Sequence, residues 1–103
     1  MVSRIDMLRQ NAHEGREIAI EAVYLAQRID TRQLEAHPLA STPLVVAAGR
    51  EGLCVLFRYG VVVFVNVMPM EQAAFRVELD ALLTERFEEP VSDRLVLAIQ
   101  RVD

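Results

Sequence analysis

Apolar residues occupy nearly every position between Leu53 and Val67, in two runs that flank the short segment Arg58-Tyr59-Gly60. Both runs are rich in β-branched and aromatic residues, which favour strands. A run that is apolar at every position, and not only at alternate ones, is typical of a sheet covered on both faces. The pattern predicts two paired strands, 53–59 and 61–67, with a tight turn at Tyr59-Gly60.

Two further strands are predicted before this pair. Residues 17–27 place apolar side chains on both sides of a strand with period two. Residues 44–48 form a short apolar run that ends at the turn Gly49-Arg50-Glu51-Gly52. Residues 44–67 are therefore expected to form a three-stranded meander at the centre of the sheet.

Helical signals occur twice. Asp30 and Gln33 have the spacing of a capping box, which predicts a short helix over Thr31–Ala36. Apolar residues return at helical spacing over Met70–Phe87, which predicts a long helix that Pro90 ends.

The predicted fold class is α+β. A last strand is expected at Leu95–Ile99, which gives the order β-α-β-β-β-α-β. This order predicts a two-layer sandwich, in which one long and one short helix pack on a mostly antiparallel sheet of four or five strands. Residues 1–16 are expected to form an N-terminal arm, and residues 17–103 a single α+β domain.

The high hydrophobic content of the chain predicts that part of its surface is covered by a partner. The chain has 103 residues, of which 52% are hydrophobic, and its net charge is −4. A small domain this apolar is expected to need cover from a partner surface, either a second copy or a missing segment of a longer chain. Basic residues form no stripe along the sequence, so nucleic-acid binding is not expected. All 11 basic residues are Arg, which fits a bacterial genome of high GC content.

A cytoplasmic location is expected. The longest apolar stretch is interrupted by Arg58, Gly60 and Asn66, and it is shorter than the ~20 residues that a membrane helix needs. The N-terminal segment lacks the apolar core of a signal peptide. We therefore expect no membrane contact by this segment itself.

The polar residues Arg58, Asn66 and Glu71 interrupt or follow the apolar runs. Arg58, with Tyr59 beside it, either offers a guanidinium to a partner's carboxylate or phosphate, or fixes its own turn by binding loop carbonyls or Glu71. Asn66 and Glu71 could bind a metal or polarise a substrate. Asn at a strand end more often fixes the following loop by hydrogen bonds. Glu near the start of a helix more often stabilises the positive end of the helix dipole.

No catalytic residue, metal ligand or cofactor is predicted. Cys54 is the single cysteine and lies within an apolar strand, where it is expected to behave as a small hydrophobe. His13 and His37 are far apart, and neither has an acidic or Cys partner at metal-binding spacing. Catalytic triads and paired acid–base carboxylates are not recognisable.

The segment Phe57–Val67, read together with Glu71, resembles the "required for meiotic nuclear division" family, also described as domain of unknown function one-five-five. The family motif has the form Phe-Arg-x-Gly-x-Val-Val-Phe-aromatic-Asn and is followed by an acidic residue that opens a helix, here Glu71. Val65 stands where the aromatic residue is expected. The resemblance implies either the N-terminal domain of a longer, membrane-associated parent chain or a naturally short relative. It implies a scaffold or adaptor, without an established activity or cofactor.

We therefore expect a non-enzymatic protein–protein interaction or scaffold domain that self-associates or docks to a helical partner or a further C-terminal half. One long and one short helix cannot shield both faces of the predicted sheet, so an apolar area should face that partner. Val62 and Val63 point to opposite faces, and a charge at the outward one should break assembly. The alternative is a small-molecule or phosphate-binding domain, possibly an enzyme, in which Arg58, Asn66 and Glu71 converge in one pocket.

Overall fold

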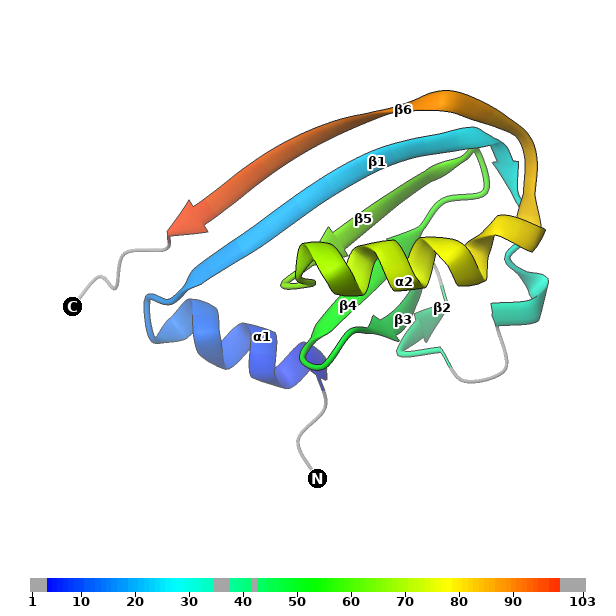
Figure 1. Cartoon of the computed structure of the whole chain (residues 1–103). Helices are drawn as coiled ribbons and strands as arrows, with labels where there is room; N and C mark the ends of the chain where they lie inside the picture. The colour runs from blue at the N-terminus through cyan, green and yellow to red at the C-terminus, as the bar shows by residue number, and fades with distance from the viewer. Residues whose placement is uncertain (1–3, 35–37, 42, 99–103) are drawn as a thin grey trace.

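A computed structural model describes residues 4–34, 38–41 and 43–98 (Figure 1). The elements in chain order are α1 (Arg4–His13), β1 (Glu17–Ile29), the 3-10 turn η1 (Arg32–Leu34), β2 (Ala40–Ser41), β3 (Leu44–Ala48), β4 (Gly52–Leu56), β5 (Val61–Val65), α2 (Pro69–Leu79), the 3-10 turn η2 (Asp80–Leu82) and β6 (Leu83–Ala98). The predicted α+β class is confirmed. Helix α1, in the segment expected to be an arm, and the two-residue strand β2 add to the expected order.

The strands form one antiparallel sheet in the order β2-β3-β4-β5-β1-β6. The predicted meander is β3-β4-β5, and β1 joins its far edge beside β5. Strand β6 lies on the outer side of β1, and the two form a long curved ribbon along one side of the molecule (Figure 1). A shift in the β1–β6 register between Tyr24 and Ala26 marks a bulge, which sharpens the bend of the ribbon.

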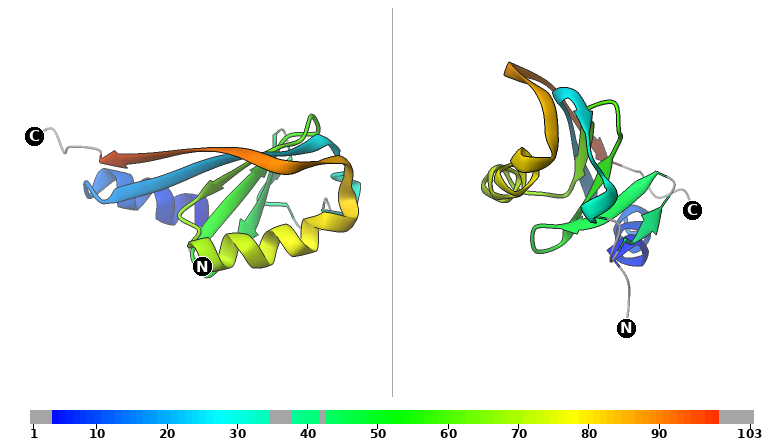
Figure 2. Two further views of the ribbon diagram at one scale, coloured as in Figure 1. Left: turned by 45° about the horizontal axis from the view of Figure 1, so that its top comes forward. Right: turned by 90° about the vertical axis from the view of Figure 1, so that its right-hand side faces the viewer.

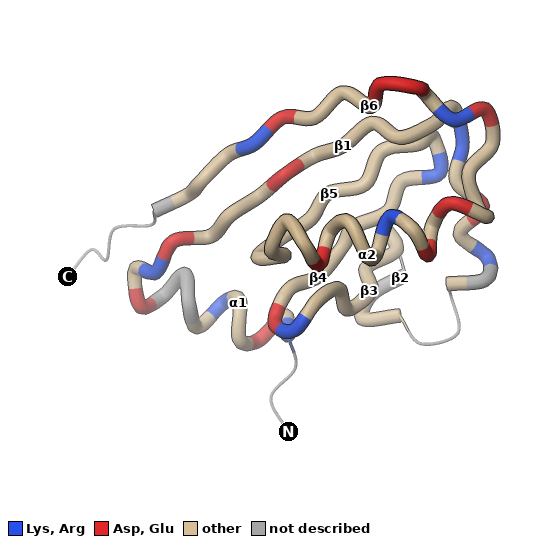
Figure 3. Tube along the Cα trace, in the orientation of Figure 1, with Lys and Arg blue, Asp and Glu red and all other residues tan. Residues whose placement is uncertain are grey.

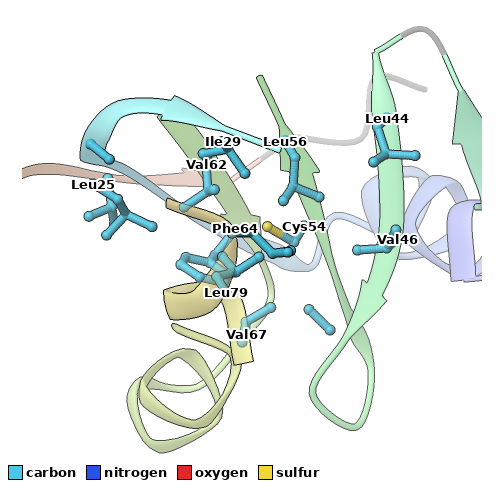
Figure 4. Packing of buried hydrophobic residues seen from close by; sticks show 14 residues of the cluster. Leu25, Ile29, Leu44, Val46, Cys54, Leu56, Val62, Phe64, Val67 and Leu79 are labelled. Atoms are coloured by element: carbon cyan, nitrogen blue, oxygen red, sulfur yellow. The ribbon is translucent and has the colours of Figure 1, made fainter. Parts of the chain in front are cut away.

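Helix α2 covers one face of the sheet and α1 lies on the other (Figure 2). The main core lies under α2, where Phe64 meets Phe75 edge to face at 5.8 Å between ring centroids. The buried side chains of this core come from β1, β3, β4 and β5, from the loop after β5, and from α2 and η2. The largest that are fully buried are Phe64, Ile29, Leu79, Val62 and Cys54 (Figure 4).

The side chain of Arg4 hydrogen-bonds helix α1 to the sheet. Nη1 of Arg4 donates to the backbone oxygens of Ala48, Gly49 and Gly52 at 3.3, 3.0 and 2.7 Å. These oxygens belong to the β3–β4 hairpin, whose turn was predicted from the sequence. The hairpin therefore holds the N-terminal end of α1 against the sheet.

The long predicted helix Met70–Phe87 is wrong in its last turns. The α-helix ends at Leu79, and residues 83–98 form β6. The apolar spacing is compatible with a helix, but pairing of Leu83 and Thr84 with the end of β1 overrides it. Pro90 does not end a helix, and instead lies within β6, in the stretch between the register pairs of Arg86 and Val91 where the bulge interrupts pairing. A bulge on an edge strand tolerates the missing N–H of proline.

Strands β4 and β5 end at Leu56 and Val65, earlier than predicted, and β1 continues to Ile29. The short helix and the last strand also differ from their predicted bounds. The short helix predicted over Thr31–Ala36 is a single 3-10 turn from Arg32 to Leu34, and Glu35 and Ala36 lie outside the described residues. Asp30 still caps this turn, since its Oδ1 accepts from the backbone N–H of Arg32 at 3.2 Å. The last strand begins at Leu83 and not at Leu95, while its predicted end at Ile99 is outside the described residues.

Candidate interaction surface

The face of the sheet on the α1 side is apolar, and we call it the open face. Its second, smaller core consists of Ile18, Leu53 and Val65, against which Ile5 and Leu8 of α1 pack. Beyond this contact the face continues with half-buried apolar side chains, namely Ile20, Val45, Val55 and Val63. One ten-residue helix therefore covers only part of it.

The open face extends onto β6. Register pairs place Leu97 beside Ile18, Leu95 beside Ile20 and Val91 beside Tyr24. These side chains are exposed, with 55% of Leu95 and 72% of Val91 accessible to solvent. Together with the half-buried positions on β1, β3, β4 and β5, they make an apolar surface that spans the sheet. Asp93, in register with Ala22, is its charged position on β6.

Alternation along the strand places Val62 and Val63 on opposite faces of the sheet, and the structure shows which face each one occupies. Val62 is fully buried in the core under α2. Val63 lies half-buried on the open face, in register with Ala22 of β1 and Val55 of β4. Val63 is therefore the candidate contact residue and Val62 is a core residue.

Asn66 ends β5 by binding β1. Its Oδ1 accepts from the N–H of Ala19 at 3.0 Å, and its own N–H donates to the Ala19 carbonyl at 2.8 Å. The backbone of Asn66 has φ of +54°, a left-handed conformation that Asn adopts more easily than most residues. Asn66 therefore ties down the strand end.

Glu71 joins α2 to the β3–β4 turn. Its Oε1 accepts from the N–H of Met68 just before the helix at 3.0 Å, and its Oε2 accepts from the N–H of Arg50 at 2.7 Å. These two backbone hydrogen bonds, with smaller contributions from the charges of Arg50 and Arg4, hold the pKa of Glu71 below its ordinary value of 4.5. The carboxylate thus links the start of α2 to the β3–β4 turn.

Replacing Glu71 with Gln should lower stability to urea at pH 7. The amide presents one acceptor where the carboxylate presents two, so one backbone N–H loses its partner. Because the folded-state pKa is depressed, the carboxylate's contribution is complete above the unfolded pKa and is lost as pH falls through the lower, folded pKa. The stability difference between wild type and variant should therefore be constant from pH 7 to about 5 and shrink below about 4.5.

Urea midpoints from pH 3 to pH 7 would measure this difference. Glu78→Gln is the matched control, since Glu78 is an exposed residue of the same helix. A pH-independent difference for Glu71→Gln, or one equal to that of the control, would contradict the assignment.

Arg58 and Tyr59 lie in the β4–β5 turn, at the opposite end of β5 from Asn66. The exposed Tyr59 ring stacks on Phe57 with 5.3 Å between centroids. Since β5 separates Arg58 from Asn66, and Glu71 follows Asn66 into α2, the three polar residues do not form one pocket. That arrangement, on which the ligand-binding alternative depended, is not present.

Cys54 is completely buried, and burial raises the pKa of its thiol to about 12. A nucleophilic cysteine needs a lowered pKa and access to solvent, so this residue acts as core packing. Across residues 4–34, 38–41 and 43–98, His, Cys, Asp and Glu side chains form no group of three that could hold a metal ion. In the same ranges, the helices are too short or too polar to cross a membrane.

Comparison of the chain with family models, with curated proteins and with solved structures finds no match. The resemblance to the "required for meiotic nuclear division" family, based on Phe57–Val67, stays a prediction. Sequence reasoning had not singled out Tyr24, Val91, Leu95 and Leu97 as surface residues. The apolar residues of β6 were the available signal. The helix predicted over Met70–Phe87 included the first residues of this strand, so its full length was not recognised.

Proposed function

We propose that this domain is a non-enzymatic protein–protein interaction module that forms a homodimer through the open face of its sheet. The observation that carries the proposal is the row of exposed apolar side chains on β6, which lies in register with the apolar positions of β1. Soluble monomers rarely expose a contiguous apolar surface of this kind unless it has a binding role.

The size of the face fits a reversible dimer. Five strands, β3 to β5 with β1 and β6, at a spacing of about 4.8 Å make a sheet roughly 20 Å across. With strands about 20 Å long, the face measures roughly 400 Å². Stable interfaces bury about 800 Å² per partner, so we expect association in the micromolar range or weaker, and not a permanent dimer.

A second copy is the partner that this chemistry favours. The face is built from strands, and sheet faces can bury one another by sheet-on-sheet packing. A two-fold axis places the same apolar patch on itself without needing complementary charges. Asp93 lies between Val91 and Leu95 in the same row of β6, which is an edge strand. The dimer must leave this carboxylate in contact with water, so β6 forms the margin of the interface and β5 lies nearer its centre.

The polar residues also support a binding role over a catalytic one. Asn66 and Glu71, which had been candidates for substrate contact, bind backbone N–H groups of Ala19, Met68 and Arg50. These contacts hold strand ends and the helix start. Their side chains therefore maintain the shape of the sheet that presents the open face.

Charges on the open face should weaken or prevent association and leave a folded monomer. Val63→Asp tests the middle of the face, and Leu95→Asp tests an exposed position on β6, where folding should be affected least. The carboxylate of Val63→Asp, in the middle of the face, would be desolvated in the dimer at a cost of several kcal/mol, which is enough to abolish a micromolar association. The carboxylate of Leu95→Asp, at the margin, should weaken the association to a smaller degree. Sedimentation equilibrium from about 10 to 500 µM would give the mass of each variant, and circular dichroism its folded state.

Val77→Asp is the matched control, because Val77 is 76% exposed on α2, away from the open face. The proposal fails if the wild type has the monomer mass of 11.6 kDa across this range. It also fails if Val77→Asp reduces association as much as Leu95→Asp. A monomeric wild type that binds a helical partner instead would assign the face to that partner.

A further inference from the structure

Three Arg side chains from separate parts of the chain line one cavity at the end of the sheet. Arg28 lies near the end of β1, Arg32 opens η1, and Arg58 lies in the β4–β5 turn. Asp30, Thr31 and Thr84 complete the polar lining of this cavity, whose volume is about 560 Å³. Figure 3 shows the Arg-bearing segments of this region at the end of the molecule away from the C-terminus.

The backbone fixes this grouping. The N–H of Ile29 donates to the carbonyl of Arg58 at 2.9 Å, so the end of β1 crosses the β4–β5 turn. The N–H of Asp30 donates to the carbonyl of Leu82 at 2.9 Å, which holds the next residue against η2. Thr84 is in register with Arg28 across the β1–β6 pair. The three guanidiniums are therefore carried by segments that hydrogen bonds hold together.

The cavity has a positive charge balance. Asp30 is the carboxylate among its lining residues, and it is paired in a two-point ion pair with Arg32, Nε to Oδ1 and Nη2 to Oδ2, both at 2.9 Å. The hydrogen bonds from Arg32, with smaller Coulombic contributions from Arg32 and Arg58, lower the pKa of Asp30 to about 2. With Arg28, Arg32 and Arg58 against Asp30, the lining carries a net charge of +2 on a chain whose net charge is −4.

We propose that this cavity, lined by Arg28, Arg32 and Arg58, binds the phosphoryl group of a small phosphorylated molecule. A guanidinium has five N–H donors in a planar fork that matches phosphate oxygens, and the two threonine hydroxyls are further donors of the right type. A phosphate monoester carries −1.5 to −2 charges at pH 7, which complements the net +2 of the lining.

The dimensions favour a small ligand over a polyanion. A volume of about 560 Å³ is in the range of small-molecule sites, about 300–1,000 Å³, and exceeds what a bare phosphate fills. A nucleic acid would need a basic stripe that continues beyond the cavity. Acidic and basic segments instead alternate along the described chain, and Glu85 directly follows Thr84 (Figure 3). The site is separate from the open face and is independent of the proposed dimer.

Titration of the ¹⁵N-labelled protein with inorganic pyrophosphate, at constant ionic strength set by chloride, would test the proposal. We expect saturable amide shifts confined to residues 28–32, 57–60 and 83–85. Arg28→Gln and Arg58→Gln should each weaken binding about tenfold, the usual effect of losing one charge-assisted hydrogen bond. Arg76→Gln is the control, since it makes the same change in net charge at an exposed residue of α2.

Several results would overturn the site. Shifts that stay linear with concentration, or that chloride alone reproduces, would show ionic screening only. Equal weakening by Arg76→Gln would show a response to net charge. Binding of a single-stranded oligonucleotide with no binding of pyrophosphate would assign the arginines to nucleic acid. Leu95→Asp should leave pyrophosphate binding unchanged, so this test and the dimer test fail independently.

Discussion

Replacing Val62 with Asp is expected to unfold the domain. Val62 has no exposed surface, and it is in register with Val23 of β1 and Leu56 of β4, both core residues under α2. A carboxylate there would lack water and a polar partner, at a cost of several kcal/mol. The total stability of a domain of this size is about 5–15 kcal/mol, so most or all of it would be lost.

Far-ultraviolet circular dichroism and urea titration would measure this effect. Val63→Asp is the comparison, because it places the same group one residue further along, on the open face. We expect a cooperative unfolding transition for Val63→Asp and none, or one at much lower urea, for Val62→Asp. Similar midpoints for the two variants would contradict the assignment of the two faces.

Gly60→Ala should be the second most damaging change, with an expected loss of about 3 kcal/mol or more. Gly60 has φ of +100°, and a Cβ built on it would lie 1.7 Å from the carbonyl oxygen of Ala26. The N–H of Leu25 also donates to the Gly60 carbonyl at 2.9 Å. An added methyl group would therefore push β1 off the β4–β5 turn and break this hydrogen bond.

Gly15→Ala separates the clash from the backbone conformation. Gly15 also has a positive φ, +77°, but it is exposed after α1, so its substitution should cost only about 1 kcal/mol. Urea midpoints of the two variants would give the difference. If Gly60→Ala costs no more than Gly15→Ala, the close approach of β1 to the turn is not present in solution.

Local signals in the sequence were enough to predict several elements. The continuous apolar runs on either side of Arg58-Tyr59-Gly60 became β4 and β5, and the Gly-bounded turn before them became the β3–β4 hairpin. Pairing of adjacent strands through short turns depends on few residues, which explains this agreement. The start of α2 also agrees with the helical spacing that begins at Met70.

The sequence predicted that an apolar surface exists, but not which face of the sheet it occupies. Excess apolar content predicted an uncovered area, but alternation along a strand shows that Val62 and Val63 face opposite sides without showing which side a helix covers. That depends on where α2 and α1 cross the sheet. The arginine cavity was hidden for a similar reason, because Arg58 is far in sequence from Arg28 and Arg32, and the end of β1 meets the β4–β5 turn only in the folded protein.

Whether residues 83–90 form a helix or a strand depends on their tertiary contacts. Their apolar spacing suits a helix, yet β1 extends to Ile29 and offers an unpaired edge over its whole length, so the chain continues as β6. Backbone hydrogen bonds to a distant strand outweigh local helix preference, which amounts to less than about 1 kcal/mol per residue. The sequence of residues 83–90 shows only their local preference, because the partner strand β1 is in place only once the sheet has formed. In this protein the resulting strand, β6, carries part of the proposed binding face.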